Sequence, residues 1–120
     1  MANNNKWLML DMDGLIEKLG YELNQTYILY DQNETSLIFD SINEKKEPII
    51  CVCQDGVSKD LYLAKLLSYL AFDSYRHAVW IVDQKTKQHN ETIEWLSMNL
   101  KNQQLSFFES KLIGFNSYDE

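Results

Sequence analysis

Short apolar runs alternate with polar breaks along the chain and predict a protein built from both strands and helices. The strongest pattern lies in residues 48–82. Its apolar run 49–53 predicts a strand buried on both faces, followed by a polar break at 54–60, an amphipathic helix to about Ala71, and a second strand at 77–82. A connection that contains one helix has the length of a crossover, so we expect the two strands to be parallel neighbours.

The flanking segments follow the same periodicities. We expect a helix at 6–19 that ends at Gly20, a hairpin of strands at 22–31 and 35–42, and, after the second strand of the crossover, a helix at 85–100 and a last strand at 105–115. Pro48 opens the third strand, and Ser58 is the expected N-cap of the crossover helix. The predicted fold is therefore mixed α/β (α+β): a helix, a three-strand antiparallel meander, a crossover helix, a strand, a helix and a strand.

The chain length fits a single domain over residues 1–120. The composition, 45% hydrophobic, is that of a folded protein rather than a disordered one. The formal net charge is −7 and Arg76 is the only arginine, so the clustered cations that bind duplex DNA are missing and duplex binding is not expected. An acidic surface suits a protein partner with a basic surface, although solubility alone would account for it equally well.

Membrane insertion and secretion are not expected. No apolar run approaches the roughly 18 residues of a membrane span, and residues 1–6 do not have the pattern of a signal peptide. Cys51 and Cys53 lie two apart on one face of a strand, where a mutual disulfide would be strained, so we expect reduced, buried thiols in a cytoplasmic protein. His77 and His89 are too few to complete a metal site with them, and His89 is expected to be a hydrogen-bonded structural histidine.

A series of short motifs, in this order, is similar to the PD-(D/E)XK nuclease family. The motifs are Trp7-Leu8, Leu19-Gly20, the strand ending at Gln54, Leu66-Leu67-Ser68-Tyr69, Val79-Trp80-Ile81, His89 with Ile93, Trp95 and Leu96, and Phe107-Phe108. They most resemble the branch that forms the N-terminal module of bacterial proteins of unknown function. The resemblance covers nearly the whole chain and implies a restriction-endonuclease-like core.

The resemblance also implies where a nuclease site would lie. In that family an Asp on the second strand and a Glu on the third hold Mg²⁺, which activates water for phosphodiester hydrolysis. The third-strand motif is Glu-x-Lys or, in this branch, Glu-x-Gln. Gln54 matches the last position, but Val52 stands where the Glu would be, and the second-strand Asp falls at Ser36. The resemblance therefore implies a degenerate site with no catalytic residue, no metal and no cofactor.

These observations favour a non-catalytic protein that binds a macromolecular partner. A small acidic protein suits an inhibitor that occupies a basic, nucleic-acid-binding groove, as phage or mobile-element inhibitors of host nucleases such as CRISPR effectors do.

Two alternatives remain open from the sequence. The first is a metal-dependent DNA or RNA endonuclease that uses Mg²⁺ or Mn²⁺ with relocated ligands: Asp40 and Asp55 beside Gln54. Asp55 would point to the opposite face from Gln54 in a regular strand. The second alternative is a homodimer formed through an exposed strand or through Phe107, Phe108 and Phe115, although these phenylalanines are more typical of a core.

Overall fold

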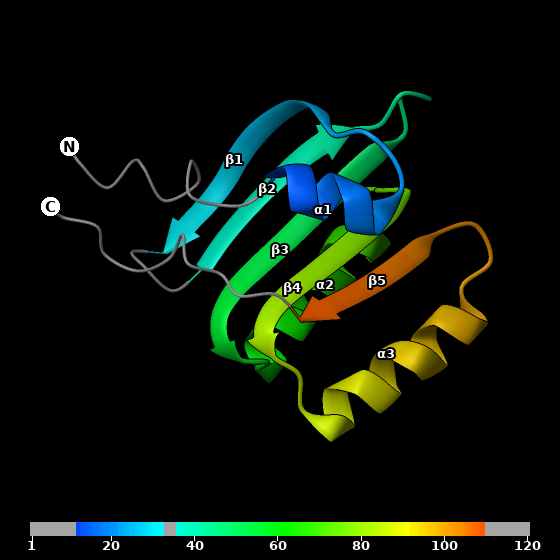
Figure 1. Ribbon diagram of the computed structural model, residues 1–120. Helices are drawn as coiled ribbons and strands as arrows, with labels where there is room; N and C mark the ends of the chain where they lie inside the picture. The colour runs from blue at the N-terminus through cyan, green and yellow to red at the C-terminus, as the bar shows by residue number, and fades with distance from the viewer. Residues whose placement is uncertain (1–11, 33–35, 110–120) are drawn as a thin grey trace, which may run out of the picture.

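Five strands form one sheet whose spatial order, β1-β2-β3-β4-β5, is also their order along the chain. The computed structural model describes residues 12–32 and 36–109. Within them the elements are α1 (Met12–Leu19), β1 (Asn24–Gln32), β2 (Ser36–Ile42), β3 (Pro48–Val57), α2 (Asp60–Phe72), β4 (His77–Gln84), α3 (Lys87–Asn99) and β5 (Gln104–Glu109). Figure 1 shows this arrangement.

The sheet changes from antiparallel to parallel at β3. The pairs β1–β2 and β2–β3 are antiparallel, whereas β3–β4 and β4–β5 are parallel. This confirms the predicted meander followed by a crossover, and with it the mixed α+β fold class. In the register, Val52 lies opposite Ile38 on one side and Trp80 on the other.

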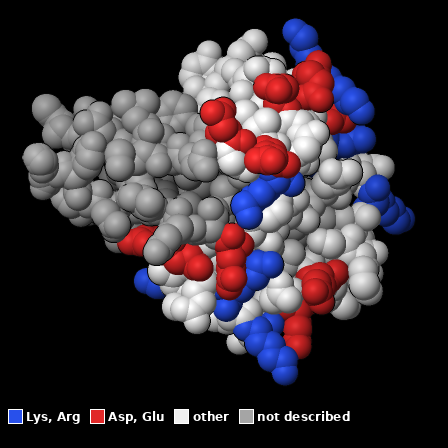
Figure 2. Space-filling view, in the orientation of Figure 1, with Lys and Arg blue, Asp and Glu red and all other residues white. Residues whose placement is uncertain are grey.

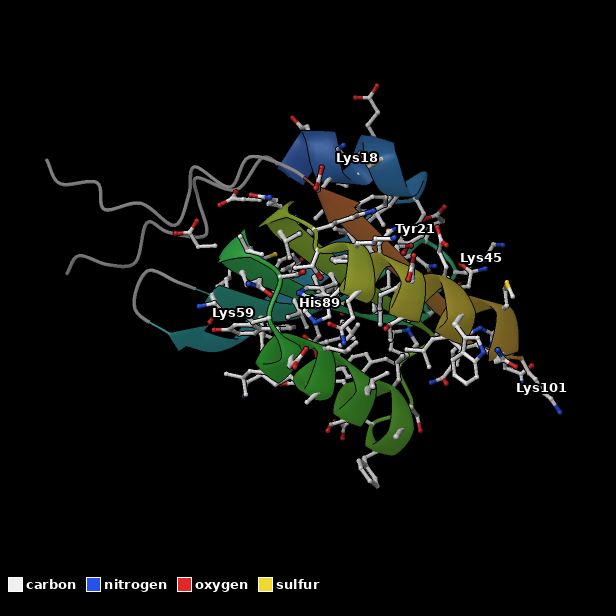
Figure 3. All side chains as sticks on the ribbon, turned by 90° about the horizontal axis from the view of Figure 1, so that it is seen from below. Lys18, Tyr21, Lys45, Lys59, His89 and Lys101 are labelled. Atoms are coloured by element: carbon white, nitrogen blue, oxygen red, sulfur yellow. The ribbon has the colours of Figure 1, made fainter. Side chains whose placement is uncertain are left out.

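Helices cover both faces of the sheet, and the strands bury alternate residues on each. Figure 3 shows α1 on one side and α2 on the other. The α1-side core contains Leu15, Leu23, Leu37, Phe39, Ile49, Cys51, Cys53, Val79 and Ile81. The core on the side of α2 and α3 contains Ile38, Ile50, Val52, Tyr62, Leu66, Leu70, Ala78, Trp80, Val82, Ile93 and Phe107. Because successive side chains of a strand point to opposite faces, the run 49–53 supplies both cores.

The third strand is longer than its sequence suggests. The predicted polar break at 54–60 was wrong in its first four residues, because β3 continues to Val57 through an irregularity at which Gly56 has a φ of +80°. The polar residues remain in the strand because the side chain of Gln54 forms hydrogen bonds within the fold. Residues 6–11 of the predicted first helix and 110–115 of the predicted last strand lie outside the described residues.

The two cysteines are free and fully buried on the α1 side, as expected. Burial raises the pKa of both thiols, that of Cys51 well above its ordinary value. Such thiols are poor nucleophiles and poor metal ligands, because both roles require the thiolate. Of the helices in residues 12–32 and 36–109, none has the length and apolarity to cross a membrane.

Candidate functional site

The three positions that the family resemblance assigns to a metal site lie on one face of the sheet, under α2. Ser36 is the direct cross-strand partner of Gln54, and Val52 lies two residues before Gln54 on the same face. All three side chains are fully buried. The fold therefore brings Ser36, Val52 and Gln54 together as the family resemblance implies, but inside the core rather than at a cleft.

The amide of Gln54 is engaged at every hydrogen-bonding position. Its Oε1 accepts from the backbone N–H of Lys59 at 3.0 Å and from Nε1–H of Trp80 at 3.2 Å. Its Nε2 donates to the carbonyl oxygens of Val57 at 2.9 Å and, more weakly, Asp55 at 3.4 Å. A glutamine amide has two acceptor lone pairs and two donor hydrogens, so no capacity is left for a ligand. Gln54 instead joins the end of β3 to the start of α2 and to β4.

Val52 packs where a carboxylate would be needed. It belongs to the same buried apolar cluster as Leu66, and Ile38 and Trp80 are its partners on the neighbouring strands. The Trp80 ring in turn stacks on Phe107, with ring centroids 4.5 Å apart. This environment is apolar, and an unpaired carboxylate placed in it would lose its hydration without a compensating partner.

Among the described residues, the hydroxyl of Ser36 has no hydrogen-bond partner. Together with Nδ1 of His77, it is one of two buried side-chain polar atoms without a partner among the described residues. A buried polar group left unpaired typically costs about 1–3 kcal/mol. The hydroxyl is therefore a local source of instability beside Gln54.

Asp40, the first of the alternative ligands, lies at the other end of β2. It pairs with Ile50, four residues from Ser36, which is about 13 Å along an extended strand. Its Oδ2 accepts a hydrogen bond from the hydroxyl of Tyr75 at 2.9 Å. Burial and this carboxylate both raise the pKa of Tyr75. Asp40 is thus held at the edge where β4 begins, away from Gln54.

Asp55, the second alternative ligand, lies at the carboxyl end of β3 beside Asp83 at the end of β4. Burial, followed by the hydrogen bond and the charge of Asp83, raises the pKa of Asp55. Oδ2 of Asp83 accepts the backbone N–H of Gly56 at 2.8 Å. The fold therefore brings Asp55 to Asp83 and not to Asp40. Sequence reasoning overlooked Asp83, although both residues follow buried runs that were predicted to be parallel neighbours.

His89 forms a second polar cluster between α2 and α3 (Figure 3). Its Nδ1 lies 2.6 Å from Oγ of Ser58, and its Nε2 lies 2.6 Å from Oδ1 of Asp60. The carboxylate of Asp60 can only accept a hydrogen bond, so Nε2 of His89 carries the ring hydrogen and donates to it. In the neutral imidazole Nδ1 then accepts the hydroxyl hydrogen of Ser58, whose Oγ also accepts the backbone N–H of Thr86 at 3.1 Å.

The order Asp60–His89–Ser58 is that of an acid–base relay, but its serine is only 4% exposed. A nucleophile must reach its substrate, so we interpret the cluster as structural. It joins the start of α2 to the start of α3, where Thr86 Oγ1 caps the helix by accepting the N–H of His89 at 3.0 Å. The expectation that Ser58 caps α2 was wrong: Lys59 occupies the N-cap position, and the serine hydroxyl is used by His89.

Carboxylates gather at the edge of the sheet where the parallel strands end. Asp55 follows the buried run of β3, Asp83 is the next-to-last residue of β4, and Glu109 ends β5 beside Asp83's neighbour Val82. Oε2 of Glu109 accepts the backbone N–H of Lys85 at 2.8 Å. We call these three residues the acidic edge. Within residues 12–32 and 36–109, no three His, Cys, Asp or Glu side chains are grouped so that they could hold a metal ion.

No protein-family model and no curated protein sequence matches this chain. Among solved structures, the apo form of EndoMS, a restriction-endonuclease-like nuclease, is similar, with a TM-score of 0.53 and 8% sequence identity. The similarity covers 84% of this chain and 45% of EndoMS, so the chain spans less than half the length of that protein. At this identity the comparison establishes architecture alone. The chain therefore has a mixed α+β fold that is similar to the restriction-endonuclease-like fold of that protein.

Proposed function

We propose that this nuclease-fold protein acts by binding a macromolecular partner and does not cleave nucleic acid. The observation that carries the proposal is Val52, a fully buried aliphatic side chain at the position where the third strand of the family holds its Glu. Mg²⁺ requires oxygen ligands, and neither Val52 nor the fully engaged amide of Gln54 offers one. The buried hydroxyl of Ser36 does not supply the missing negative charge.

The charge of the chain supports a partner with a basic surface. The formal net charge is −7, and the acidic edge lines the carboxyl ends of the parallel strands, where open α/β sheets commonly bind ligands. Among the described residues on the face seen in Figure 2, cationic side chains are interspersed with acidic ones and form no continuous basic patch. We therefore infer that the partner is a protein with a basic, nucleic-acid-binding groove, such as a host defence nuclease of the CRISPR effector class.

The test is affinity capture from a host lysate at low and high salt, followed by titration of each captured protein with the purified chain. We expect binding that weakens as salt rises, because opposite charges across an interface are screened. The triple variant Asp55→Asn, Asp83→Asn and Glu109→Gln should weaken binding at least tenfold.

A matched control separates the acidic edge from net charge. The triple variant Asp13→Asn, Glu17→Gln and Glu94→Gln removes the same three charges at exposed positions on α1 and α3. It should leave the affinity within about twofold of that of the unmodified chain. Equal losses in the two triple variants would assign the binding to net charge alone, and the absence of any partner at every salt concentration would refute the proposal.

A metal-dependent nuclease is the second candidate, and the contact between Asp55 and Asp83 favours it. Two carboxylates at the carboxyl ends of adjacent strands are the minimal start of a divalent-cation site. Incubation with single- and double-stranded DNA and RNA in Mg²⁺ or Mn²⁺ tests this candidate. Cleavage that is lost in both Asp55→Ala and Asp83→Ala but retained in Asp40→Ala would replace our proposal with this one.

A further inference from the structure

Three tyrosines lie around Asp40 on the α2 side of the sheet. The direct cross-strand partner of Asp40 on β1 is Tyr27, so the two side chains point to the same face. The hydroxyl of Tyr75, in the loop between α2 and β4, donates to Oδ2 of Asp40 at 2.9 Å. The rings of Tyr75 and of Tyr69 on α2 meet edge to face, with centroids 5.9 Å apart and planes at 79°. We call Tyr27, Asp40, Tyr69 and Tyr75 the Asp40 cluster.

The Asp40 cluster is open to solvent. On this face α2 packs over β3 and β4 and α3 packs over β5, so neither helix covers β1 (Figure 1). Tyr27 is 63% exposed, and the other three side chains of the cluster are half-buried. The aromatic rings and the carboxylate are therefore within reach of a ligand, unlike the buried Val52 and Gln54.

The charges at the Asp40 cluster are negative. Asp73 is the C-cap of α2, and the last turn of α2 has no basic residue, although a cation there would balance the negative end of the helix dipole. Burial first, and then the carboxylates of Asp40 and Asp73, raise the pKa of both Tyr69 and Tyr75. Within the described part of the chain, neither carboxylate belongs to an ion pair. The cluster therefore favours a cation that these residues do not supply.

Aromatic faces beside a carboxylate are the groups that bind an ammonium ion. A cation is attracted to the face of an aromatic ring, and cages of several rings bind ammonium ligands. The perpendicular rings of Tyr69 and Tyr75 form two walls of a corner. Oδ1 of Asp40 has no hydrogen-bond partner among the described residues, whereas Oδ2 already accepts from Tyr75. One available oxygen suits the compact ammonium of lysine better than the bidentate fork of arginine.

We propose that the Asp40 cluster binds the ammonium group of a lysine side chain of a protein partner. The assignment of this lysine to a protein, rather than to a free amine, rests on the proposed function, in which the partner has a basic surface. Arg76, which follows Tyr75, does not fill the site, because its Nε is directed at Glu47, 3.9 Å away. The cluster lies where β4 begins and the acidic edge where β4 ends, so the two contact different parts of the partner.

Titration of the purified full chain with N-acetyl-lysine methylamide, followed by proton–nitrogen NMR, tests the site without any partner. We expect saturable shifts of the backbone signals of Tyr27, Asp40 and Tyr75, with a dissociation constant of about 1–10 mM, as befits one side chain. N-acetyl-glutamine methylamide at the same ionic strength should cause no such shifts. Binding of n-butylammonium about tenfold tighter than the lysine compound would assign the site to a free amine and overturn the proposal.

Substitutions separate the aromatic and acidic contributions. Tyr27→Leu keeps an apolar side chain but removes the ring and should weaken lysine binding about threefold, whereas Tyr27→Phe keeps the ring and should leave the affinity unchanged. Asp40→Asn retains an acceptor for the hydroxyl of Tyr75 but removes the charge, and should weaken binding about tenfold. The matched controls are Trp95→Leu, an aromatic residue of α3 that is 62% exposed, and Asp13→Asn, an exposed carboxylate of α1. Both should bind the lysine compound as the unmodified chain does.

Two further results would overturn the proposal. One is the absence of saturable shifts with the lysine compound, and the other is an affinity that Asp40→Asn leaves unchanged. Circular dichroism checks that each variant keeps the helical content of the unmodified chain. Because this titration needs no captured protein, a site that fails to bind lysine leaves the proposed function standing. Absence of every partner in the affinity capture would instead refute the proposed function, and with it the assignment of the lysine to a protein.

Discussion

Trp80 donates its indole N–H to Oε1 of Gln54, 3.2 Å away, across the parallel β3–β4 pair. Both side chains are fully buried, and the same oxygen accepts the backbone N–H of Lys59 at the start of α2. The glutamine that the family resemblance assigns to a nuclease motif is thus the junction of two strands and a helix. Its importance in this chain can be measured as stability, without any activity.

Replacing this glutamine should destabilise the fold strongly. Gln54→Ala leaves the indole N–H of Trp80 and the backbone N–H of Lys59 buried without an acceptor, and we expect a loss of about 2–4 kcal/mol in the free energy of unfolding. Urea denaturation followed by tryptophan fluorescence measures it. Gln84→Ala, at the exposed end of β4, should change the free energy by less than about 0.5 kcal/mol. A loss below about 1 kcal/mol for Gln54→Ala would show that the network contributes little.

Removing the unpaired hydroxyl of Ser36 should stabilise the protein, in contrast to the replacement of Gln54. Ser36→Ala deletes a buried polar atom that has no hydrogen-bond partner in the described part of the chain, and we expect a gain of about 0.5–1 kcal/mol in the free energy of unfolding. The same urea titration detects the change. The control is Ser58→Ala, which removes a hydroxyl bonded to both His89 and Thr86 and should destabilise the protein. If Ser36→Ala were destabilising, the hydroxyl would have to be paired in solution.

Glu47 should make the stability sensitive to acid. Hydrogen bonds from the side chains of Asn43 and His77 lower the pKa of Glu47 to about 2. Because the folded-state pKa lies below the unfolded value of about 4.3, the stabilisation is present above that value and is lost as the pH falls through about 2. The stability difference between the unmodified chain and Glu47→Gln should therefore be largest above about pH 5 and shrink toward pH 2.

Thermal unfolding across this pH range measures the effect. Glu17→Gln, an exposed glutamate on α1, is the matched control and should show little difference at any pH. A Glu47→Gln difference that did not vary with pH would contradict the lowered pKa.

Asp55 and Asp83 should give the stability a pH dependence opposite in sign to that of Glu47. Burial, and then Asp83, raises the pKa of Asp55 in the folded protein. Protonated Asp55 therefore stabilises the fold below its unfolded-state pKa of about 3.9, and this stabilisation is lost as the pH rises through its folded-state pKa. At neutral pH the two charges oppose folding. Asp83→Asn should therefore stabilise the protein at pH 7, lower the pKa of Asp55, and have a smaller effect in acid. Carbon-13 NMR titration of the carboxyl groups reports the pKa directly. If the pKa of Asp55 were the same in Asp83→Asn as in the unmodified chain, Asp83 would not perturb it.

The order of elements was predictable because it depends on local periodicity. The buried run 49–53 and the helix after it define the crossover, and their pattern survives in the structure with changes only at the ends. The end of β3 was not predictable. The local sequence at Gln54 and Gly56 predicts a break in the strand. The hydrogen bonds that hold this segment in the strand join Gln54 to Trp80 and Gly56 to Asp83, which lie 26 and 27 residues further along the chain.

The candidate site was predictable only in part for the same reason. The positions of Ser36, Val52 and Gln54 on one face follow from the period of two in a strand. The contact between Asp55 and Asp83 depends on the β3–β4 register, and the use of Ser58 by His89 spans 31 residues. Short-range patterns carry no information about such pairings, which therefore appear only in three dimensions.

The identity of spatial and sequential strand order affects how the protein is made. Each strand after the first pairs with the strand synthesised just before it, and no later strand has to be inserted between two earlier ones. A chain emerging from the ribosome can thus extend the sheet from β1 toward β5 in the direction of translation. During such vectorial growth the only open edges are β1 and the newest strand, and this limits mispairing with neighbouring nascent chains.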